Sequence, residues 1–287
     1  MDVSPPADEI QTDRFQTLGG EQPFRWCAPA GAARACFAVL PAVGIRGAYY
    51  DAFLQALAAR GFAGAAADWP GSGESPVRAD RRTRWSYDAL VNAHAAGLRN
   101  AIEARFAGVP FYWVGHSLGG HVALMHAGRY GADGVCLLAS GGPDRRAWRG
   151  ASTLGLAGRV HLMVAITGAL GYWPGRAFGF GERESAQWVF DWYRAYRTGS
   201  FRTARFDGDA ALRAWTGPTL VVTVADDPLA PKASTQFLVG RTRSEVQWQQ
   251  WSPDHPVGHN RWPRLGPDVM AERIEAWVRR SATRSAE

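Results

Sequence analysis

The stretch "FYWVGHSLGGHVALMH", residues 111–126, decides how this chain is interpreted. An apolar run that predicts a buried strand leads directly into a segment with the composition of a helix. Gly115 and Gly119, two positions on either side of Ser117, leave room for the sharp turn that such a junction requires. We therefore expect Ser117 in a strained, exposed conformation at the carboxyl end of a parallel strand, where open α/β sheets bind ligands. The N–H of Leu118, at the start of the helix, is expected to point into the same space.

Short apolar runs alternate with helical patterns along most of the remaining chain. The expected strands are residues 36–43, 62–68, 111–115, 134–140, 219–225 and 245–251. Helical patterns follow several of these strands; Gly61 ends the first helix, and Ser86 is placed to cap the second. Such alternation predicts an α/β fold with a mostly parallel central sheet flanked by helices.

The alternation fails between residues 143 and 215. This segment is long, rich in arginine, glycine and aromatic residues, and its pattern is mostly helical. Because it lies between two strands, we expect a helical lid (143–215) inserted late in the sheet, with residues 1–142 and 216–287 forming the core. Aromatic residues of the lid such as Trp173 and Trp188 are expected to line a hydrophobic substrate pocket, with a small core of the lid itself as the alternative.

The overall composition excludes several classes of protein. With 287 residues and 46% hydrophobic content, the chain can bury a large core. The net charge is +6, but the arginines are scattered and lack interleaved aromatic residues, so no nucleic-acid groove is expected. The three cysteines are far apart and form neither a disulfide framework nor a metal-ligand spacing.

Two histidines on the helix after the turn also argue against a metal site. His121 and His126 are five residues apart, so they face different sides of a helix and do not share a metal ion. We interpret both as packed within the helix layer or exposed to solvent. No metal and no cofactor is expected.

No segment of the sequence is expected to cross a membrane. The first fifteen residues carry acids and prolines and lack the apolar centre of a signal peptide. The longest apolar run, residues 160–173, is too short to span a bilayer, and we expect a cytoplasmic protein. Arg159 and Arg176 flank this run, which also suits a helix lying on a membrane surface, although packing on the core is the simpler interpretation.

A serine hydroxyl becomes a good nucleophile beside a base, and the base needs a carboxylate that orients it. Of the seven histidines, His255 and His259 lie in the loop after the last strand, and His259 is better placed, shortly before the final helix. His116 is too close to Ser117 along the turn to reach its hydroxyl from the opposite side, and we place His116 in the substrate pocket instead.

The candidate carboxylates lie at the ends of two later strands. Asp226 and Asp227 follow the strand 219–225, and a pair of adjacent carboxylates is unusual at a buried strand end. One of the two is therefore expected to have a function, and the other to be solvated. Asp144, after the preceding strand, is an alternative acid.

The chain resembles the α/β-hydrolase superfamily over about residues 30–280. The segments that carry the resemblance are "GHSLGG", "DDPLAP" and "VGHNRW", in the order Ser, Asp, His, together with the glycine-rich turn "DWPGSGES". The resemblance implies that the acid is the aspartate four residues before a proline, which is Asp227. It also implies a second oxyanion donor after the first core strand, where the segment reads "LPAVGIRGAYY" without the family's histidine. There the N–H of Ile45, after Gly44, is the expected donor.

A narrower resemblance concerns the lid. The segments "GYWPGRAFGFGE" and "QWVFDWYR", together with "GHNRW", are similar to a bacterial group of predicted α/β hydrolases related to monoglyceride lipases and lysophospholipases. The substrates of this group are mostly unassigned, so the narrower resemblance implies little chemistry.

Together these residues predict a serine hydrolase of carboxylic esters with a small hydrophobic substrate. Ser117 attacks the acyl carbon, His259 moves the proton, Asp227 orients the imidazole, and the N–H groups of Leu118 and Ile45 bind the oxyanion. A thioesterase or acyltransferase with the same triad and a non-catalytic ligand-binding homologue are the alternatives. A dehalogenase or epoxide hydrolase is disfavoured, because those members of the superfamily have aspartate at the turn. The sequence does not indicate an oligomeric state.

Overall fold

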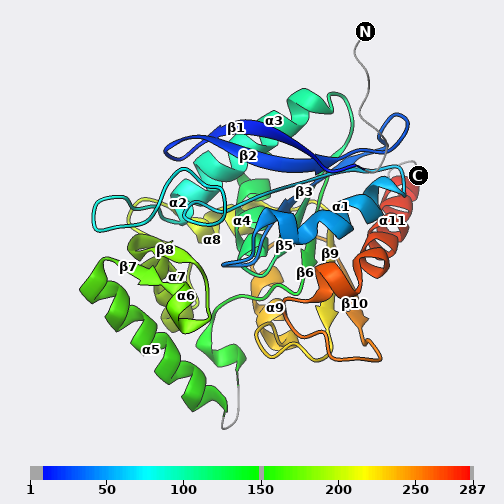
Figure 1. Cartoon of the computed structure of the whole chain (residues 1–287). Coiled ribbons are helices and arrows are strands. Elements are labelled where there is room, and N and C mark those ends of the chain that lie inside the picture. Colours follow the sequence, from blue (N-terminus) through cyan, green and yellow to red (C-terminus); the bar gives the residue numbers. More distant parts are fainter. Residues whose placement is uncertain (1–8, 149–151, 285–287) are drawn as a thin grey trace.

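A computed structural model describes residues 9–148 and 152–284, which are built around one eight-stranded sheet (Figure 1). Its strands are β1 (Gln11–Thr17), β2 (Gly20–Cys27), β3 (Cys36–Leu40), β4 (Ala63–Ala67), β5 (Phe111–His116), β6 (Gly134–Leu138), β9 (Thr219–Val224) and β10 (Val246–Trp251). They lie in the order β1-β2-β4-β3-β5-β6-β9-β10, and every pair from β4 to β10 is parallel. All six expected strands are present. Residues 1–8, part of the N-terminal segment that is not expected to be a signal peptide, lie outside the described residues.

The two strands at the other edge were not expected from the sequence. β1 and β2 form an antiparallel hairpin, and β2 also pairs antiparallel with β4. In β1 only Phe15 is fully buried, because this strand lies at the edge of the sheet and its polar side chains face solvent. Such a strand lacks the apolar run by which the inner strands can be detected.

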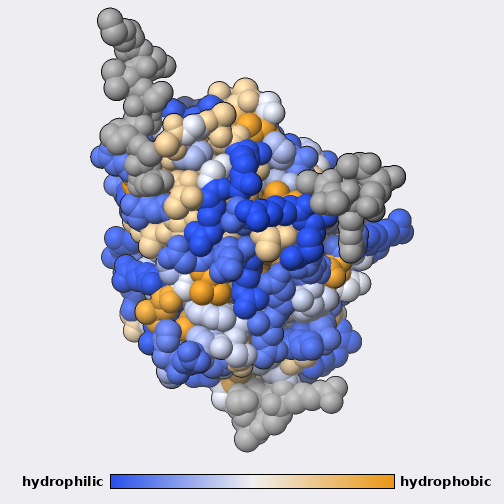
Figure 2. Space-filling view, turned by 90° about the vertical axis from the view of Figure 1, so that its right-hand side faces the viewer, coloured by the Kyte–Doolittle hydropathy of each residue, from blue (hydrophilic) through white to orange (hydrophobic). Residues whose placement is uncertain are grey.

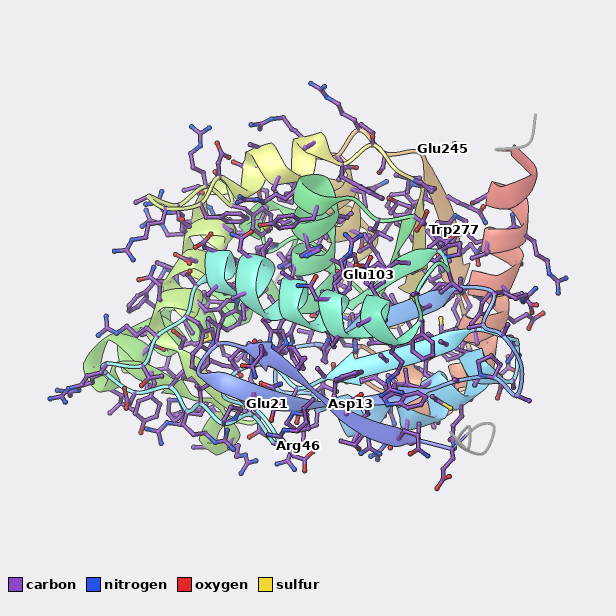
Figure 3. All side chains as sticks on the ribbon, turned by 90° about the horizontal axis from the view of Figure 1, so that it is seen from above. Asp13, Glu21, Arg46, Glu103, Glu245 and Trp277 are labelled. Atoms are coloured by element: carbon purple, nitrogen blue, oxygen red, sulfur yellow. The ribbon has the colours of Figure 1, made fainter. Side chains whose placement is uncertain are left out.

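Helices cover both faces of the sheet. They are α1 (Asp51–Ala58), α2 (Tyr87–Ala89), α3 (Ala96–Arg105), α4 (Leu118–Tyr130), α8 (Gly208–Ala214), α9 (Lys232–Val239), α10 (Trp262–Leu265) and α11 (Pro267–Arg284). Helices α3, α4 and α8 bury their apolar sides in one core cluster, whereas α1 and α11 bury theirs in a second cluster on the opposite face. Figure 3 looks down onto α3, which carries Glu103, with α11 and Trp277 at one end and the lid at the other.

The helix expected after Ser86 has three parts. Ser86 accepts a hydrogen bond from the N–H of Ala89, as expected for a cap, and α2 continues into the π-helical turn η2 (Leu90–Ala95) and then into α3. Before α1, the 3-10 turn η1 (Gly47–Tyr50) carries the chain away from β3. These short elements place Tyr50 beneath the carboxyl ends of the strands, where its side chain is fully buried.

The segment between β6 and α8, which we call the lid after the sequence prediction, is seen at the lower left of Figure 1. It contains the 3-10 turn η3 (Arg145–Ala147), α5 (Ser152–Leu170), β7 (Tyr172–Pro174), α6 (Gly175–Phe178), β8 (Arg183–Ser185) and α7 (Ala186–Thr198). The expectation of a mostly helical segment missed the antiparallel pair β7–β8. Residues 149–151 of the expected lid lie outside the described residues.

The last helix of the expected lid segment, α8, belongs to the helix layer of the core. It packs closely on α4, since a Cβ atom added at Gly128 would lie 1.9 Å from the carbonyl oxygen of Ala211. The return to strand–helix alternation therefore begins at α8, before β9. No helix among the described residues combines the length and the apolar character needed to cross a bilayer.

Large apolar side chains that are exposed gather on the lid more than elsewhere. They include Leu162, Leu170, Phe178, Phe180 and Phe190. The face that carries α11 and β10 is mostly hydrophilic, with isolated apolar residues (Figure 2). Among the described residues, more of the exposed large apolar side chains thus lie on the segment expected to form the lid than on the rest of the chain.

Candidate active site

The turn between β5 and α4 has the strained geometry expected from its sequence. Ser117 has φ 53° and ψ −116°, in the left-handed region that non-glycine residues rarely adopt. A Cβ atom on Gly115 would lie 2.3 Å from Cα of Gly120, and one on Gly119 would lie 1.8 Å from the carbonyl oxygen of Leu40. Only glycine fits at these two positions, so the tight turn depends on both of them.

A buried aspartate orients the imidazole of His259. Asp227 Oδ2 lies 2.8 Å from His259 Nδ1, while Oδ1 accepts hydrogen bonds from the N–H groups of Leu229 and Ala230 at 2.8 and 2.9 Å. Because an ionised carboxylate only accepts hydrogen bonds, Nδ1 of His259 carries the proton and Nε2 is left free to take one. Asp227 and His259 are thus hydrogen-bonded in the way that the predicted base and its orienting acid require.

The residues considered as alternatives to Asp227 and His259 have other contacts. Asp226 Oδ2 accepts hydrogen bonds from the N–H groups of Val257 and Gly258, both at 2.9 Å, so it holds the loop that carries His259. Asp144 is buried against Arg146, which keeps the pKa of the Asp144 carboxyl low despite burial. His255 is exposed on the loop.

The N–H of Ile45, the predicted oxyanion donor, already has a hydrogen-bond partner, whereas two other N–H groups beside Ser117 have none in the described part of the chain. The N–H of Ile45 donates to the carbonyl oxygen of Ala42 at 3.1 Å, closing a β-turn in which Gly44 has φ +72°. Ile45 is therefore not available as an oxyanion donor, and its assignment was wrong. Within the described residues the N–H groups of Val43, inside this turn, and of Leu118 make no hydrogen bond.

His116 does not line the cavity, in contrast to its predicted place in the substrate pocket. Its side chain is fully buried beneath the turn, with Nδ1 2.7 Å from Tyr50 Oη and Nε2 3.0 Å from the carbonyl oxygen of His259. Burial, together with the charge of neighbouring His259, lowers the pKa of His116 well below its ordinary value. The extended backbone of β5 directs this side chain to the opposite side from the hydroxyl of Ser117.

A cavity of about 550 Å³ lies above the serine, between the core and the lid. Ser117, Leu118 and His259 line its floor, and Val43 and Ile45 line one side. From the lid it is lined by aromatic side chains, which include Trp148, Trp173, Phe178, Phe180, Trp188, Trp192 and Tyr196. Both predicted pocket residues of the lid, Trp173 and Trp188, therefore face this cavity, although they also pack in the larger core cluster.

Ser117 and His259 share the cavity without a hydrogen bond between them in this structure. In the part of the chain that is described, the hydroxyl of Ser117 makes no hydrogen bond. Contacts between a nucleophile and its base are often long in unliganded enzymes and shorten when substrate is bound. The carbonyl oxygen of Ser117 is held from below by Ser140, whose Oγ donates to it at 2.7 Å.

His121 also lines the cavity, although the sequence predicts only packing or solvent exposure for it. Its Nε2 lies 2.7 Å from the carbonyl oxygen of Gly141 and its Nδ1 lies 3.0 Å from Tyr87 Oη. Burial lowers the pKa of His121 to about 4, so the ring is neutral and donates from Nε2. The signal was its position one helical turn after Ser117, on the same side of α4. Within residues 9–148 and 152–284, no cluster of three histidine, cysteine or acidic side chains is placed to hold a metal ion.

A comparison with models of protein families shows to which family the chain belongs. The model of the family described as "Alpha/beta hydrolase family" matches residues 31–273. The chain belongs to the alpha/beta hydrolase family. No curated protein sequence matches this alpha/beta hydrolase.

Several solved structures share the fold of this alpha/beta hydrolase at low sequence identity. A thermostable carboxyl esterase from Bacillus coagulans is 15% identical, with a TM-score of 0.66 and coverage of 96% of this chain and 99% of the esterase. A monoacylglycerol lipase from Paleococcus ferrophilus is 17% identical, with a TM-score of 0.56 and coverage of 95% and 99%. A haloalkane dehalogenase loop variant from Bradyrhizobium elkanii is 13% identical, with a TM-score of 0.64 and coverage of 97% and 100%. One fold thus carries different chemistry, and the side chains of the site must decide the reaction.

Proposed function

We propose that this alpha/beta hydrolase is a serine hydrolase that cleaves carboxylic esters of hydrophobic substrates through an acyl-enzyme. The observation that carries the proposal is the strained Ser117 in one cavity with His259, whose Nδ1 is bound by the buried carboxylate of Asp227. Serine at this position supports acyl transfer and argues against dehalogenation or epoxide opening, which require a carboxylate nucleophile.

In the proposed first step, Ser117 Oγ attacks the acyl carbon of the ester while His259 Nε2 takes the hydroxyl proton. The tetrahedral intermediate collapses, the bond to the alcohol oxygen breaks, and the imidazolium returns the proton to the leaving alcohol. Water then attacks the acyl-enzyme with His259 again as the base, which releases the acid and restores the serine. Asp227 keeps Nδ1 protonated and stabilises the imidazolium in both steps.

The negative charge that develops on the acyl oxygen is assigned to the N–H groups of Leu118 and Val43. Both residues line the cavity beside Ser117, and neither N–H has a hydrogen-bond partner in the described part of the chain. Leu118 also opens α4, so the partial positive charge of the helix N-terminus favours the oxyanion there. Val43 replaces Ile45 in this role, because the N–H of Ile45 is used within its own turn.

The lining of the cavity supports a hydrophobic acyl group or a hydrophobic alcohol. A cavity of about 550 Å³ walled by lid aromatics gains free energy from every apolar group that it removes from water. The carboxyl esterase and the monoacylglycerol lipase among the structural neighbours support ester hydrolysis as the class of reaction. A thioesterase or an acyltransferase would use the same residues, and a homologue that only binds its ligand would retain the cavity.

A panel of substrates tests the proposal. We expect the purified protein to hydrolyse p-nitrophenyl esters of medium-chain acids with turnover, and to cleave matched acyl-CoA thioesters less efficiently, as measured by kcat/KM. A higher kcat/KM for thioesters would favour the thioesterase, and acylated alcohol in place of free acid would favour the acyltransferase. Binding of these esters without any hydrolysis would contradict the enzyme altogether.

A further inference from the structure

A chain of hydrogen bonds runs beneath the candidate active site and joins three loops that are distant in the sequence. The N–H of Ala42 donates to Tyr50 Oη at 3.1 Å, and Tyr50 Oη lies 2.7 Å from His116 Nδ1. His116 Nε2 lies 3.0 Å from the carbonyl oxygen of His259. We call these four residues the buried relay. It begins in the loop after β3, passes through the residue before the serine, and ends at the backbone of the candidate base.

Each bond of the buried relay can have only one direction. The carbonyl oxygen of His259 can only accept, so Nε2 of His116 carries the proton and Nδ1 accepts from the hydroxyl of Tyr50. The oxygen of Tyr50 then accepts the N–H of Ala42. Burial lowers the pKa of His116 and raises that of Tyr50, so both side chains stay neutral and the pattern persists over the working range of pH.

The buried relay lies in a closely packed part of the protein interior. Tyr50 and His116 are both 0% exposed, and the ring of Trp262 packs edge-on against each of them, with centroid distances of 5.9 and 5.4 Å. Hydrogen bonds are stronger in such a low-dielectric interior than in water. Neither Tyr50 nor His116 lines the substrate cavity, so neither is placed to touch a substrate.

We propose that Tyr50 and His116 are positioning residues, which fix the loop after β3 (residues 41–46, the oxyanion loop) and the backbone of His259 relative to each other. The proposal rests on the serine-hydrolase function given above. Val43 follows Ala42 directly, so the direction of its N–H depends on where Tyr50 holds the Ala42 peptide. At the other end, the bond from His116 holds the His259 backbone in the place from which its ring binds Asp227 and lines the same cavity as Ser117. A displacement of about 1 Å in such groups can cost about a hundredfold in rate.

The substitution Tyr50→Phe tests the buried relay, because it removes one hydroxyl and keeps the ring. We expect kcat for a p-nitrophenyl ester to fall about tenfold to a hundredfold, while KM changes less than about threefold, since the substrate contacts are intact. Tyr112→Phe is the matched control. Tyr112 lies in the same core cluster at the far end of β5, and its hydroxyl makes no hydrogen bond within the described residues. Wild-type kcat in Tyr50→Phe, measured well below its Tm, would overturn the proposal.

A double-mutant cycle separates a relay from independent packing effects. We expect His116→Leu to lower kcat as much as Tyr50→Phe does, and the double variant to lose little more than the worse single variant. His116→Gln, which retains an N–H donor toward the carbonyl oxygen of His259, should recover part of the lost kcat. Multiplicative losses in the double variant, with no recovery by glutamine, would contradict the relay. If His116→Leu does not fold, Tyr50→Phe and His116→Gln decide the question.

Labelling by a fluorophosphonate distinguishes failure of this proposal from failure of the proposed function. We expect wild-type protein to be labelled rapidly and Tyr50→Phe to be labelled about tenfold more slowly, because the probe needs both the base and the oxyanion donors. Equal labelling rates of the two proteins would overturn the buried relay alone. Absence of labelling in the wild type would overturn the serine hydrolase and the relay with it.

Discussion

At the scale of single residues, the adjacent carboxylates Asp226 and Asp227 have separate partners. Asp227 binds the ring of His259, and Asp226 binds two backbone N–H groups of the loop that carries this histidine. We expect Asp227→Asn to lower kcat about a thousandfold or more, because an amide can donate to Nδ1 and favour the wrong tautomer of His259. Asp226→Asn keeps an oxygen that accepts from the loop, so its kcat should fall less than about tenfold. A larger loss in Asp226→Asn than in Asp227→Asn would mean that the acid has been misassigned.

Glu184 in β8 provides a prediction about pH. Burial raises the pKa of this carboxyl from its ordinary 4.5 to about 7, although the N–H of Glu182 donates to it at 3.0 Å. Between these two values the folded state holds a proton that the unfolded chain has released, so this group makes the protein less stable as the pH rises from 4.5 to about 7. Glu184→Gln should therefore raise Tm by about 5 °C at pH 8 and leave it nearly unchanged at pH 4.5. A gain of equal size at both values would show that Glu184 is not protonated in the fold.

At the scale of elements, the loop between β7 and β8 rests on the oxyanion loop. A Cβ atom added to Gly44 would lie 2.5 Å from Cα of Gly181, and Arg46 Nη2 lies 3.5 Å from Glu182 Oε1 across the same contact. The lid therefore helps to hold the turn that presents the N–H of Val43.

Substitution of Gly44 tests this contact between lid and core. We expect Gly44→Ala to lower kcat/KM at least about tenfold, because the new methyl group must push the lid or the turn aside. Gly131→Ala is the control for backbone strain, since Gly131 has φ +76° against +72° for Gly44 but has no atom within 4 Å of its added Cβ. Equal kcat/KM values for the two variants would show that the contact has no part in the site.

Local spacing made the central elements predictable. Features that depend on contacts between distant elements could not be predicted in this way. Gly115 and Gly119 decide the turn at Ser117 within a few residues, so the sequence suffices there. Whether Val43 or Ile45 has a free N–H for the oxyanion depends on which of the two N–H groups forms the hydrogen bond inside the turn. The orientation of His116 depends on Tyr50, 66 residues earlier in the chain, and no local pattern encodes that pairing. The hairpin β1–β2 was not predicted, because an edge strand with one buried side chain lacks an apolar run.

At the scale of the whole molecule, the cavity exists only because the lid covers the carboxyl end of the sheet. A pocket of this kind gains about 0.8 kcal/mol for each methylene that it buries, which is about fourfold in kcat/KM. We expect kcat/KM to rise from acetyl to medium-chain p-nitrophenyl esters until the cavity is full.

The lid aromatics should control this dependence on chain length. Trp188→Ala should flatten the profile while short esters are still cleaved, and it should also lower Tm, because Trp188 is 3% exposed in the core cluster. Trp248→Ala on β10, which is 39% exposed and outside the cavity, is the control. If Trp188→Ala lowers Tm but keeps the wild-type profile, the aromatics of the lid form its own core and do not select the substrate.

The most direct test of the account is covalent labelling of the nucleophile. Wild-type protein treated with a fluorophosphonate should gain the mass of one phosphonyl group, and peptide mass spectrometry should locate this group on Ser117. Ser117→Ala should fold with a similar circular dichroism spectrum, because the turn contributes little packing, and it should lose both labelling and ester turnover. Labelling of another residue, or full turnover in Ser117→Ala, would contradict the assignment of Ser117 as the nucleophile.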